Sequence, residues 1–141
     1  SDKLSEIYLD RYIRTLVGHL QYSLREGKDV EYELNLENVS VDIMQAVPCG
    51  IIVNELVTNA QKHGVKDIES GHITVTLYKR EEGTIELSVG DNGPGVPEDF
   101  SLNSANSLGL NLVDMLTKQI DGEVSVDSSG GTTFTITFPE V

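Results

Sequence analysis

The sequence of 141 residues is poor in basic side chains, in cysteine and in long apolar runs. It has 10 lysines and arginines against 23 aspartates and glutamates, which gives a formal net charge of −13. Such a surface repels nucleic acid and anionic membranes, so a local site must hold any polyanionic ligand. No stretch approaches the ~18 consecutive apolar residues of a membrane span, and no signal peptide precedes the first predicted helix. We therefore expect a soluble, cytoplasmic fragment that binds no nucleic acid and does not contact the membrane directly.

The single cysteine, Cys49, excludes a disulfide bond within the chain and fits a reducing compartment. We expect it to be a small buried side chain. A length of 141 residues suits one domain with one hydrophobic core. The first residues, SDKL, lack a methionine and indicate a piece of a longer protein.

Hydrophobic periodicity predicts three helices and five strands. The predicted helices span roughly residues 10–25, 42–64 and 108–120. The predicted strands lie near residues 30–36, 72–79 and 84–90, and in a final hairpin over 123–139. The order α, β, α, β, β, loop, α, β, β predicts an α+β two-layer sandwich, with three helices on one face of a mixed, mostly antiparallel sheet.

The second predicted helix has recognisable start and stop signals. Asp42 and Gln45 have the spacing of a capping box. Pro48 is expected either to kink the helix or to begin its main part. Gly64 is expected to end it.

The end of this helix, NELVTNAQKHG over residues 54–64, has an unusual distribution of polar residues. At about 100° per residue, four polar residues lie along one edge of the apolar face: Glu55, Asn59, Lys62 and His63. Three others are predicted to face water: Asn54, Thr58 and Gln61. The polar edge fits either the lining of a pocket or an ordinary boundary with a Glu/Lys pair.

Three later stretches contain glycine, and each has two interpretations. DNGPG at 91–95 follows a buried strand, where an aspartate is held by the sheet and glycines let the backbone approach a flat ligand, but it also specifies a turn. SLGL at 107–110 opens a helix whose free amides suit phosphate, although a glycine there is weak evidence. GGTTF at 130–134 also fits a plain hairpin turn. Neither a P-loop nor a Rossmann motif is present.

The order of these four stretches resembles the ATP-binding domain of sensor histidine kinases, whose Bergerat fold is shared with gyrase and mismatch-repair ATPases. NELVTNAQKHG is similar to the asparagine box of that family, and DNGPG, SLGLNLV and GGTTFTITFP are similar to its three glycine boxes. The resemblance spans roughly residues 7–141. It implies a single domain over 1–141, with a linking helix in about 1–27 and a nucleotide-binding core in 28–141. The pattern ELxxNAxKH looks most like the branch of bacterial and archaeal kinases in which PAS or other sensor domains are common.

The resemblance implies that ATP and Mg²⁺ are the cofactors and assigns residues to them. Asn59 would give its amide oxygen to Mg²⁺, a hard ion that prefers oxygen ligands. Lys62 would contact phosphate, and His63 the ribose or the phosphate edge. Asp91 would accept the adenine amino hydrogen, with Thr132 completing the adenine contacts.

The resemblance also implies a lid over about residues 96–107, mobile without nucleotide. Gly93 and Gly95 would begin this lid. The backbone amides of Leu108, Gly109 and Leu110 would cradle phosphates. The sequence departs from the family at Ser107, where many members have glycine, and this change is expected to stiffen the end of the lid.

By resemblance, the activity is transfer of the γ-phosphate of Mg-ATP to a histidine on a separate dimerisation domain, with a response regulator downstream. Glu55 and Lys62 are the catalytic candidates. Glu55 is also the glutamate of an E-x-x-x-N pattern found in anti-sigma-factor serine kinases, where it deprotonates a hydroxyl. A serine kinase, or a degenerate module that binds ATP or only a partner, are the alternatives. His19 is not expected to be the phosphoacceptor, because no acidic residue or arginine adjoins it, and His72 has no partner evident in the sequence.

Overall fold

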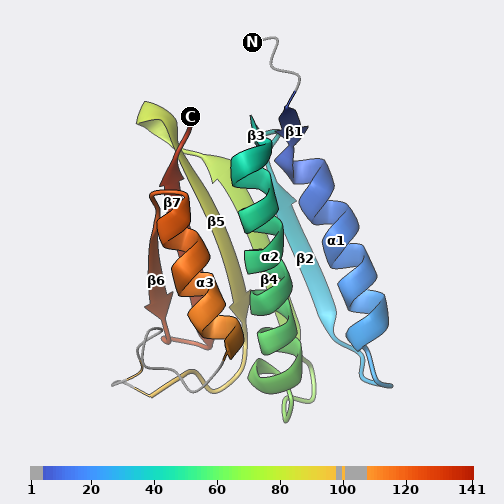
Figure 1. The fold of residues 1–141 in the computed structure, drawn as a ribbon. Coiled ribbons are helices and arrows are strands. Elements are labelled where there is room, and N and C mark those ends of the chain that lie inside the picture. The colour runs from blue at the N-terminus through green and yellow to red at the C-terminus, as the bar shows by residue number, and fades with distance from the viewer. Residues whose placement is uncertain (1–4, 98–99, 101–107) are drawn as a thin grey trace.

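The computed structural model describes residues 5–97, 100 and 108–141. In these residues the chain forms two layers, a five-stranded sheet and three helices that cover one of its faces (Figure 1). The helices are α1 (Leu9–Leu24), α2 (Ile43–Asn59) and α3 (Leu108–Gln119). The strands of the large sheet are β2 (Glu31–Leu36), β4 (His72–Lys79), β5 (Thr84–Asp91), β6 (Glu123–Asp127) and β7 (Thr132–Pro139). The predicted α+β sandwich is confirmed.

The strand order in this sheet is β2-β4-β5-β7-β6. Only β2 and β4 are parallel, and the connection between them contains α2. The other pairs are antiparallel, including the two predicted hairpins, β4–β5 and β6–β7. Every second residue of β7, and of β4 as far as Leu77, is buried, because these residues point to the face that the helices cover. The sheet is therefore mixed and mostly antiparallel, as predicted.

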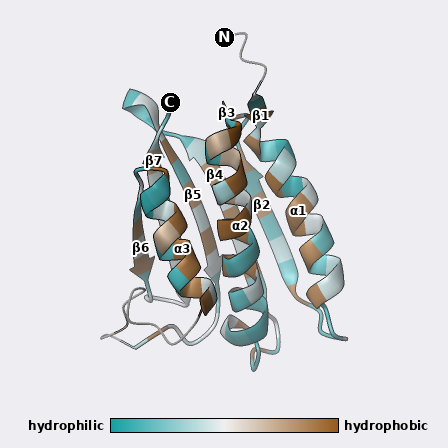
Figure 2. Ribbon diagram, viewed as in Figure 1, coloured by the Kyte–Doolittle hydropathy of each residue, from teal (hydrophilic) through white to brown (hydrophobic). Residues whose placement is uncertain are grey.

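The hydrophobic core fills the space between the helices and the sheet, and its apolar residues alternate along the strands (Figure 2). The helix residues with no exposed surface include Ile13 and Val17 of α1, Ile52 and Val53 of α2, and Val113 of α3. Since α1 contributes to the same core as α2 and the sheet, this helix is packed as part of the domain. Cys49 is also fully buried, as predicted, and burial raises the pKa of its thiol to about 12.

Two short strands were not predicted. β1 (Glu6–Tyr8) pairs antiparallel with β3 (Ser40–Asp42) at the beginning of α1 and α2. Each strand has three residues. A segment of this length is too short to show an alternating hydrophobic pattern, so only the pairing reveals it.

The start of α2 differs in part from the prediction. Asp42 is the N-cap, and its Oδ1 accepts a hydrogen bond of 2.8 Å from the backbone N–H of Met44. Gln45 does not complete a capping box, because its buried Nε2 donates instead to the carbonyl of Pro139, 2.8 Å away. Pro48 lies inside one continuous helix and does not begin it.

None of the helices in the described part of the chain is long and apolar enough to cross a membrane.

Candidate functional site

The last turn of the second predicted helix is not α-helical. A π-turn, η1 (Ala60–Gly64), continues α2, and the N–H of Val65 donates to the carbonyl of Ala60, five residues earlier, at 2.9 Å. This wider turn rotates each residue by less than 100°, so the α-helical projection misplaces the residues after Ala60. The prediction that Gln61 faces water was wrong. Gln61 is only 6% exposed, and its Oε1 accepts a hydrogen bond of 2.6 Å from the Tyr32 hydroxyl of β2.

The polar residues at the end of α2 and in η1 line one depression of about 140 Å³ between this helix and the start of α3. Its lining residues are Glu55, Thr58, Asn59, Lys62, His63, Gly109 and Leu110. The prediction of Thr58 as a water-facing residue is corrected, because Thr58 is half-buried in this lining. Of the two interpretations of the polar edge, the geometry supports the pocket lining.

Asn59 is half-buried in the depression, and its amide forms no hydrogen bond with any described residue. Glu55 beside it accepts a hydrogen bond of 3.1 Å from the Asn54 amide, which is half-buried and not fully turned to water as predicted. Lys62 and His63 are exposed at the rim and have no ion-pair partner among the described residues. The depression therefore offers a free amide oxygen and a cation to a ligand.

Asp91 is the last residue of β5 and pairs with Thr132, the first residue of β7. Its Oδ1 accepts a hydrogen bond of 2.8 Å from the N–H of Gly93, and the backbone of Thr132 also bonds the carboxylate. Burial raises the pKa of Asp91, while these two backbone hydrogen bonds act in the opposite direction. The sheet thus holds a half-buried carboxylate in a fixed position at its edge.

Three glycines make close approach to Asp91 possible. A Cβ on Gly64 would collide with the carboxylate of Asp91, and a Cβ on Gly93 would collide with the carbonyl oxygen of Gly64. A Cβ on Gly131, whose φ is +123°, would collide with the backbone oxygen of Asp91. These glycines come from NELVTNAQKHG, DNGPG and GGTTF, so three of the four sequence stretches meet here.

The fourth stretch, SLGL, reaches the depression through Gly109 and Leu110. Leu108, the first residue of α3, is 86% exposed. Gly95 has a φ of +89° and lies near the backbone oxygen of Ser128, close to the β6–β7 turn. The sequence stretches that are far apart in the chain therefore come together at one end of the sheet.

Sequence reasoning missed several residues of this region. Gly64 was interpreted as the end of the helix. The structure gives a further reason for glycine at this position, because a Cβ there would collide with the carboxylate of Asp91. Gly131 was interpreted as a turn residue and as part of a glycine box, and its contact with Asp91 was not predicted. Tyr32 lies on β2 and gave no signal, because its partner Gln61 is 29 residues away in the sequence.

The expected lid over residues 96–107, and the departure at Ser107, lie mostly outside the described residues, which include only 96, 97 and 100 of this range. The ring of Phe100 lies edge-on to Phe134 of β7, with centroids 6.2 Å apart.

The described residues contain no group of three or more His, Cys, Asp or Glu side chains that could hold a metal ion by itself. A divalent cation in the depression would therefore need oxygen atoms from a bound ligand or from water, in addition to those of the residues that line it. This donor set fits Mg²⁺, which keeps water and ligand phosphates as its other ligands.

Two of the three histidines lie away from the depression. His19 is exposed on α1, as expected. His72 does have partners, because its Nδ1 and Nε2 lie 3.2 Å from carboxylate oxygens of Glu31 and Glu33. These contacts come from the parallel pairing of β2 with β4, which the sequence did not reveal.

Comparison with known proteins agrees with this geometry. A sequence model of the family described as histidine kinase-, DNA gyrase B-, and HSP90-like ATPase matches residues 45–141. The chain is 28% identical over 134 residues to Blue-light-activated histidine kinase 2 of Erythrobacter litoralis, in an alignment that covers 94% of this chain and 37% of that protein. It is 30% identical over 150 residues to Heme sensor protein HssS of Staphylococcus saprophyticus, covering 96% of this chain and 31% of that protein.

The fold is also similar to solved structures. The histidine kinase domain from Erythrobacter litoralis EL346 blue-light activated histidine kinase superposes with a TM-score of 0.87 and 25% sequence identity, over 95% of this chain and 62% of that chain. The chain spans about a third of the length of the curated relatives named above, which align over 37% and 31% of their lengths.

Proposed function

We propose that this chain, which belongs to the family of histidine kinase-, DNA gyrase B-, and HSP90-like ATPases, is the catalytic, ATP-binding domain of a longer sensor histidine kinase. It transfers the γ-phosphate of Mg-ATP to a histidine on a dimerisation domain of the same protein, with a response regulator downstream. The observation that carries this proposal is the meeting of all four sequence stretches at one end of the sheet. In the same proposal, residues 1–27 link this domain to the rest of the protein.

Asp91 is the residue proposed to recognise adenine. Its carboxylate is held by backbone donors and lies against glycines, so a flat ring with an amino group can come close to it. Thr132 lies beside it in the sheet and completes the adenine contacts. Gly93 and Gly95 have no side chain, so the chain that follows Asp91 does not obstruct the space beside its carboxylate.

The phosphates belong in the depression between α2 and α3. Lys62 supplies positive charge there, and His63 contacts the ribose or the phosphate edge. The backbone amides of Leu108, Gly109 and Leu110 lie in the first turn of α3, where the helix dipole favours anions.

Asn59 is the proposed magnesium ligand, because its half-buried amide has no hydrogen-bond partner among the described residues. Bound Mg²⁺ would neutralise phosphate charge during in-line transfer. The chain's own contribution is then mainly positioning and electrostatic stabilisation by Lys62 and the amides of α3.

Glu55 supports a second candidate function. It lines the same depression as Asn59, where a carboxylate can accept a proton from a substrate hydroxyl. A serine kinase of the anti-sigma-factor type would use it in this way. The exposed Lys62–His63 pair and the amino-terminal helix favour the histidine kinase.

Calorimetry with ATP in the presence and absence of Mg²⁺ tests the metal assignment. We expect Asn59→Ala to remove most of the metal dependence of binding, because Asn59 is the one protein ligand that the proposal assigns to Mg²⁺. Asn35→Ala, an exposed change on β2, is the matched control and should bind like the parent chain. Equal metal dependence in Asn59→Ala and the parent would refute the role of Asn59.

Label transfer from radioactive ATP tests the activity. The chain alone should not label itself, and it should label a supplied helical domain that carries the acceptor histidine. Phosphohistidine is lost in acid and phosphoserine is not, so acid-stable label on the partner would favour the serine kinase. Label on His19 of the chain alone would contradict the proposal that the acceptor lies on another domain.

A further inference from the structure

The basic residues of the described chain fall into two groups. Three form ion pairs with carboxylates: Lys79 with Glu140, Arg80 with Glu86, and Lys118 with Asp114. The other six have no carboxylate within ion-pair distance in the described part of the chain: Arg11, Arg14, Arg25, Lys28, Lys62 and Lys66. In a chain with a net charge of −13, six cations without acidic partners need an explanation.

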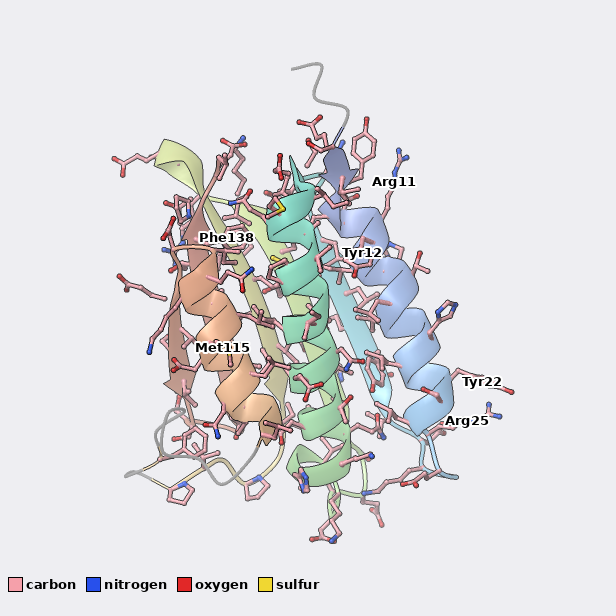
Figure 3. The ribbon with its side chains drawn as sticks, in the orientation of Figure 1. Arg11, Tyr12, Tyr22, Arg25, Met115 and Phe138 are labelled. Carbon is pink, nitrogen blue, oxygen red and sulfur yellow. The ribbon has the colours of Figure 1, made fainter. Side chains whose placement is uncertain are left out.

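We call these six residues the basic face, which consists of arginines along α1 and a cluster of cations at its end. Arg11, Arg14 and Arg25 fall within about 60° of one another on α1 at 100° per residue, so they form a stripe along most of the helix. In Figure 3, Tyr22 and Arg25 project from α1 on the side away from α2, and Arg11 projects outward at the other end of the helix. The stripe therefore lies on the outer edge of the helical layer.

At the end of α1 the basic face is concave. Arg25, Lys28, Lys62 and Lys66 line a depression of about 460 Å³, together with Leu24, Glu26 and Gln61. The ammonium group of Lys28 is held there by hydrogen bonds to the carbonyls of Val65, at 2.6 Å, and Lys66. One carboxylate, Glu26, is in the lining, and it forms no ion pair with these cations. A concave site with four cations and one carboxylate favours an anionic group.

The composition of the face suits a protein partner. The guanidinium of Arg11 lies 4.5 Å from the ring centroid of Tyr8, and that of Arg25 lies 4.2 Å from the ring of Tyr22. Such contacts orient the guanidinium groups before binding and place tyrosine beside arginine, two residues that dominate the energetics of protein interfaces. The strongly negative remainder of the chain repels a long polyanion or an anionic membrane, whereas a short acidic segment needs only the face itself.

We propose that the basic face binds an acidic protein segment that presents several carboxylates. Arg11, Arg14 and Arg25 contact carboxylates along α1, and the depression at its end receives a further one. Lys62 is shared with the proposed ATP site, whereas Arg11, Arg14 and Arg25 lie outside that site. Substitutions at the arginines therefore test the inference separately from nucleotide binding.

Fluorescence anisotropy with a labelled peptide, EAAAEAAEAAAE, tests the proposal. The chain should bind this probe, and binding should weaken as NaCl rises from about 50 to about 200 mM, because salt screens exposed charges. The double substitution Arg14→Glu with Arg25→Glu should weaken binding by about tenfold or more, since opposed charges become like charges. Lys79→Glu with Lys118→Glu makes the same change in net charge outside the face and should alter binding by less than about twofold.

The outcomes distinguish the ligand classes. Equal losses in the two double variants, or no binding of the peptide at low salt, would overturn the proposal. Tighter binding of a single-stranded DNA 12-mer or of phosphatidylserine vesicles than of the peptide would assign the face to another class of partner and also overturn it. Displacement of the peptide by inorganic phosphate at low millimolar concentration would mean a small-anion site instead. If the Glu variant is not folded by circular dichroism, Arg14→Gln with Arg25→Gln replaces it, and this variant should still show a clear loss of binding.

Calorimetry with Mg-ATP separates this proposal from the proposed function. The Arg14 and Arg25 variant should bind nucleotide like the parent chain. A chain that binds the peptide but not ATP would refute the nucleotide site and leave the basic face in place.

Discussion

The two ends of the sheet differ in how their polar side chains are paired. At the end that carries the β4–β5 hairpin and the C-terminus, polar groups are paired with one another: Lys79 bonds Glu140 at 2.7 Å, and the carboxylate of Glu86 contacts Arg80 and Tyr78. Gln45 of α2 is also tied to this end through Pro139.

The opposite end, at the bottom of Figure 1, carries Asp91, the π-turn and the start of α3. Here the Asn59 amide and Lys62 have no hydrogen-bond or ion-pair partner among the described residues, and three glycines allow the backbone to approach Asp91 closely. At one end of the sheet, the closed end, Lys79, Glu86 and Gln45 are bonded to other residues of the chain. At the other end, the open end, the described residues offer the Asn59 amide and the Lys62 ammonium no such partner. Departures from local rules gather where a ligand must be accommodated.

The largest effect is expected for Gly131→Ala, which tests whether glycine at the open end is required by contact. A Cβ would collide with the backbone oxygen of Asp91, and the φ of +123° strains any other residue. We expect a loss of about 3 kcal/mol or more in the free energy of unfolding, measured with urea. Gly18→Ala on α1 is the matched control, because a Cβ there meets nothing within 4 Å, and it should stabilise the chain by about 0.5–1 kcal/mol.

The next largest effect concerns the carboxylate itself. Asp91→Asn should weaken ATP and ADP equally, by roughly 1–3 kcal/mol, because an amide can set a donor against the adenine amino group. Calorimetry with both nucleotides measures this. If the variant binds ADP as tightly as the parent chain does, Asp91 does not contact adenine and serves only to form the turn.

The pH dependence of stability gives a second test of Asp91. Burial raises its pKa in the folded chain, so its contribution is favourable at low pH and is lost as pH rises through the folded-state value. The free energy of unfolding of Asp91→Asn should therefore rise relative to that of the parent chain as pH increases. Asp127 is the control of opposite sign, because hydrogen bonds from Ser129 lower its pKa, and its contribution is lost as pH falls. Urea unfolding of both variants between acid and neutral pH should show opposite trends relative to the parent.

The sequence predicts the framework well, because periodicity is a local signal. The apolar face of α1 and the alternation in β4 and β7 depend only on residues near in the chain, and the structure confirms these elements. The four glycine- and asparagine-containing stretches can likewise be read directly from the sequence. Their order along the chain was therefore predicted without knowledge that they lie close together in the fold.

Two of the errors involve partners far apart in sequence. Gln45 has the spacing of a capping box, yet the carbonyl of Pro139, 94 residues away, takes its amide. Gln61 was placed by an α-helical projection that the π-turn invalidates, and Tyr32 then stabilises it in a buried position. Local rules cannot rank such competing contacts, because their energies depend on which segments the fold brings together.

An intermediate effect is expected for Tyr32→Phe, which tests whether this distant contact supports the open end. The change leaves Gln61 Oε1 buried without its donor, at a cost of about 1–3 kcal/mol in unfolding free energy. Because Gln61 precedes Lys62 in the π-turn, ATP affinity should fall as well. Tyr22→Phe removes an exposed hydroxyl from α1 and should change stability by less than about 0.5 kcal/mol. Equal stability of the two variants would mean that Tyr32 does not hold the turn.

The smallest effect is expected at the closed end, for Lys79→Gln. The side chains of Lys79 and Glu140 are 46% and 37% exposed, so solvent screens their ion pair and its loss should cost at most about 1 kcal/mol, less at high salt. ATP affinity should not change, because this pair lies at the far end of the sheet. Lys62→Gln is the matched substitution at the open end and should give the reverse result, with nearly unchanged urea unfolding and a clear loss of ATP affinity. Among the described residues, Lys62 has no carboxylate partner whose loss would destabilise the chain. If both variants affect stability and nucleotide binding alike, the two ends do not differ in function, and the charge left unpaired beside the depression has no connection with ATP.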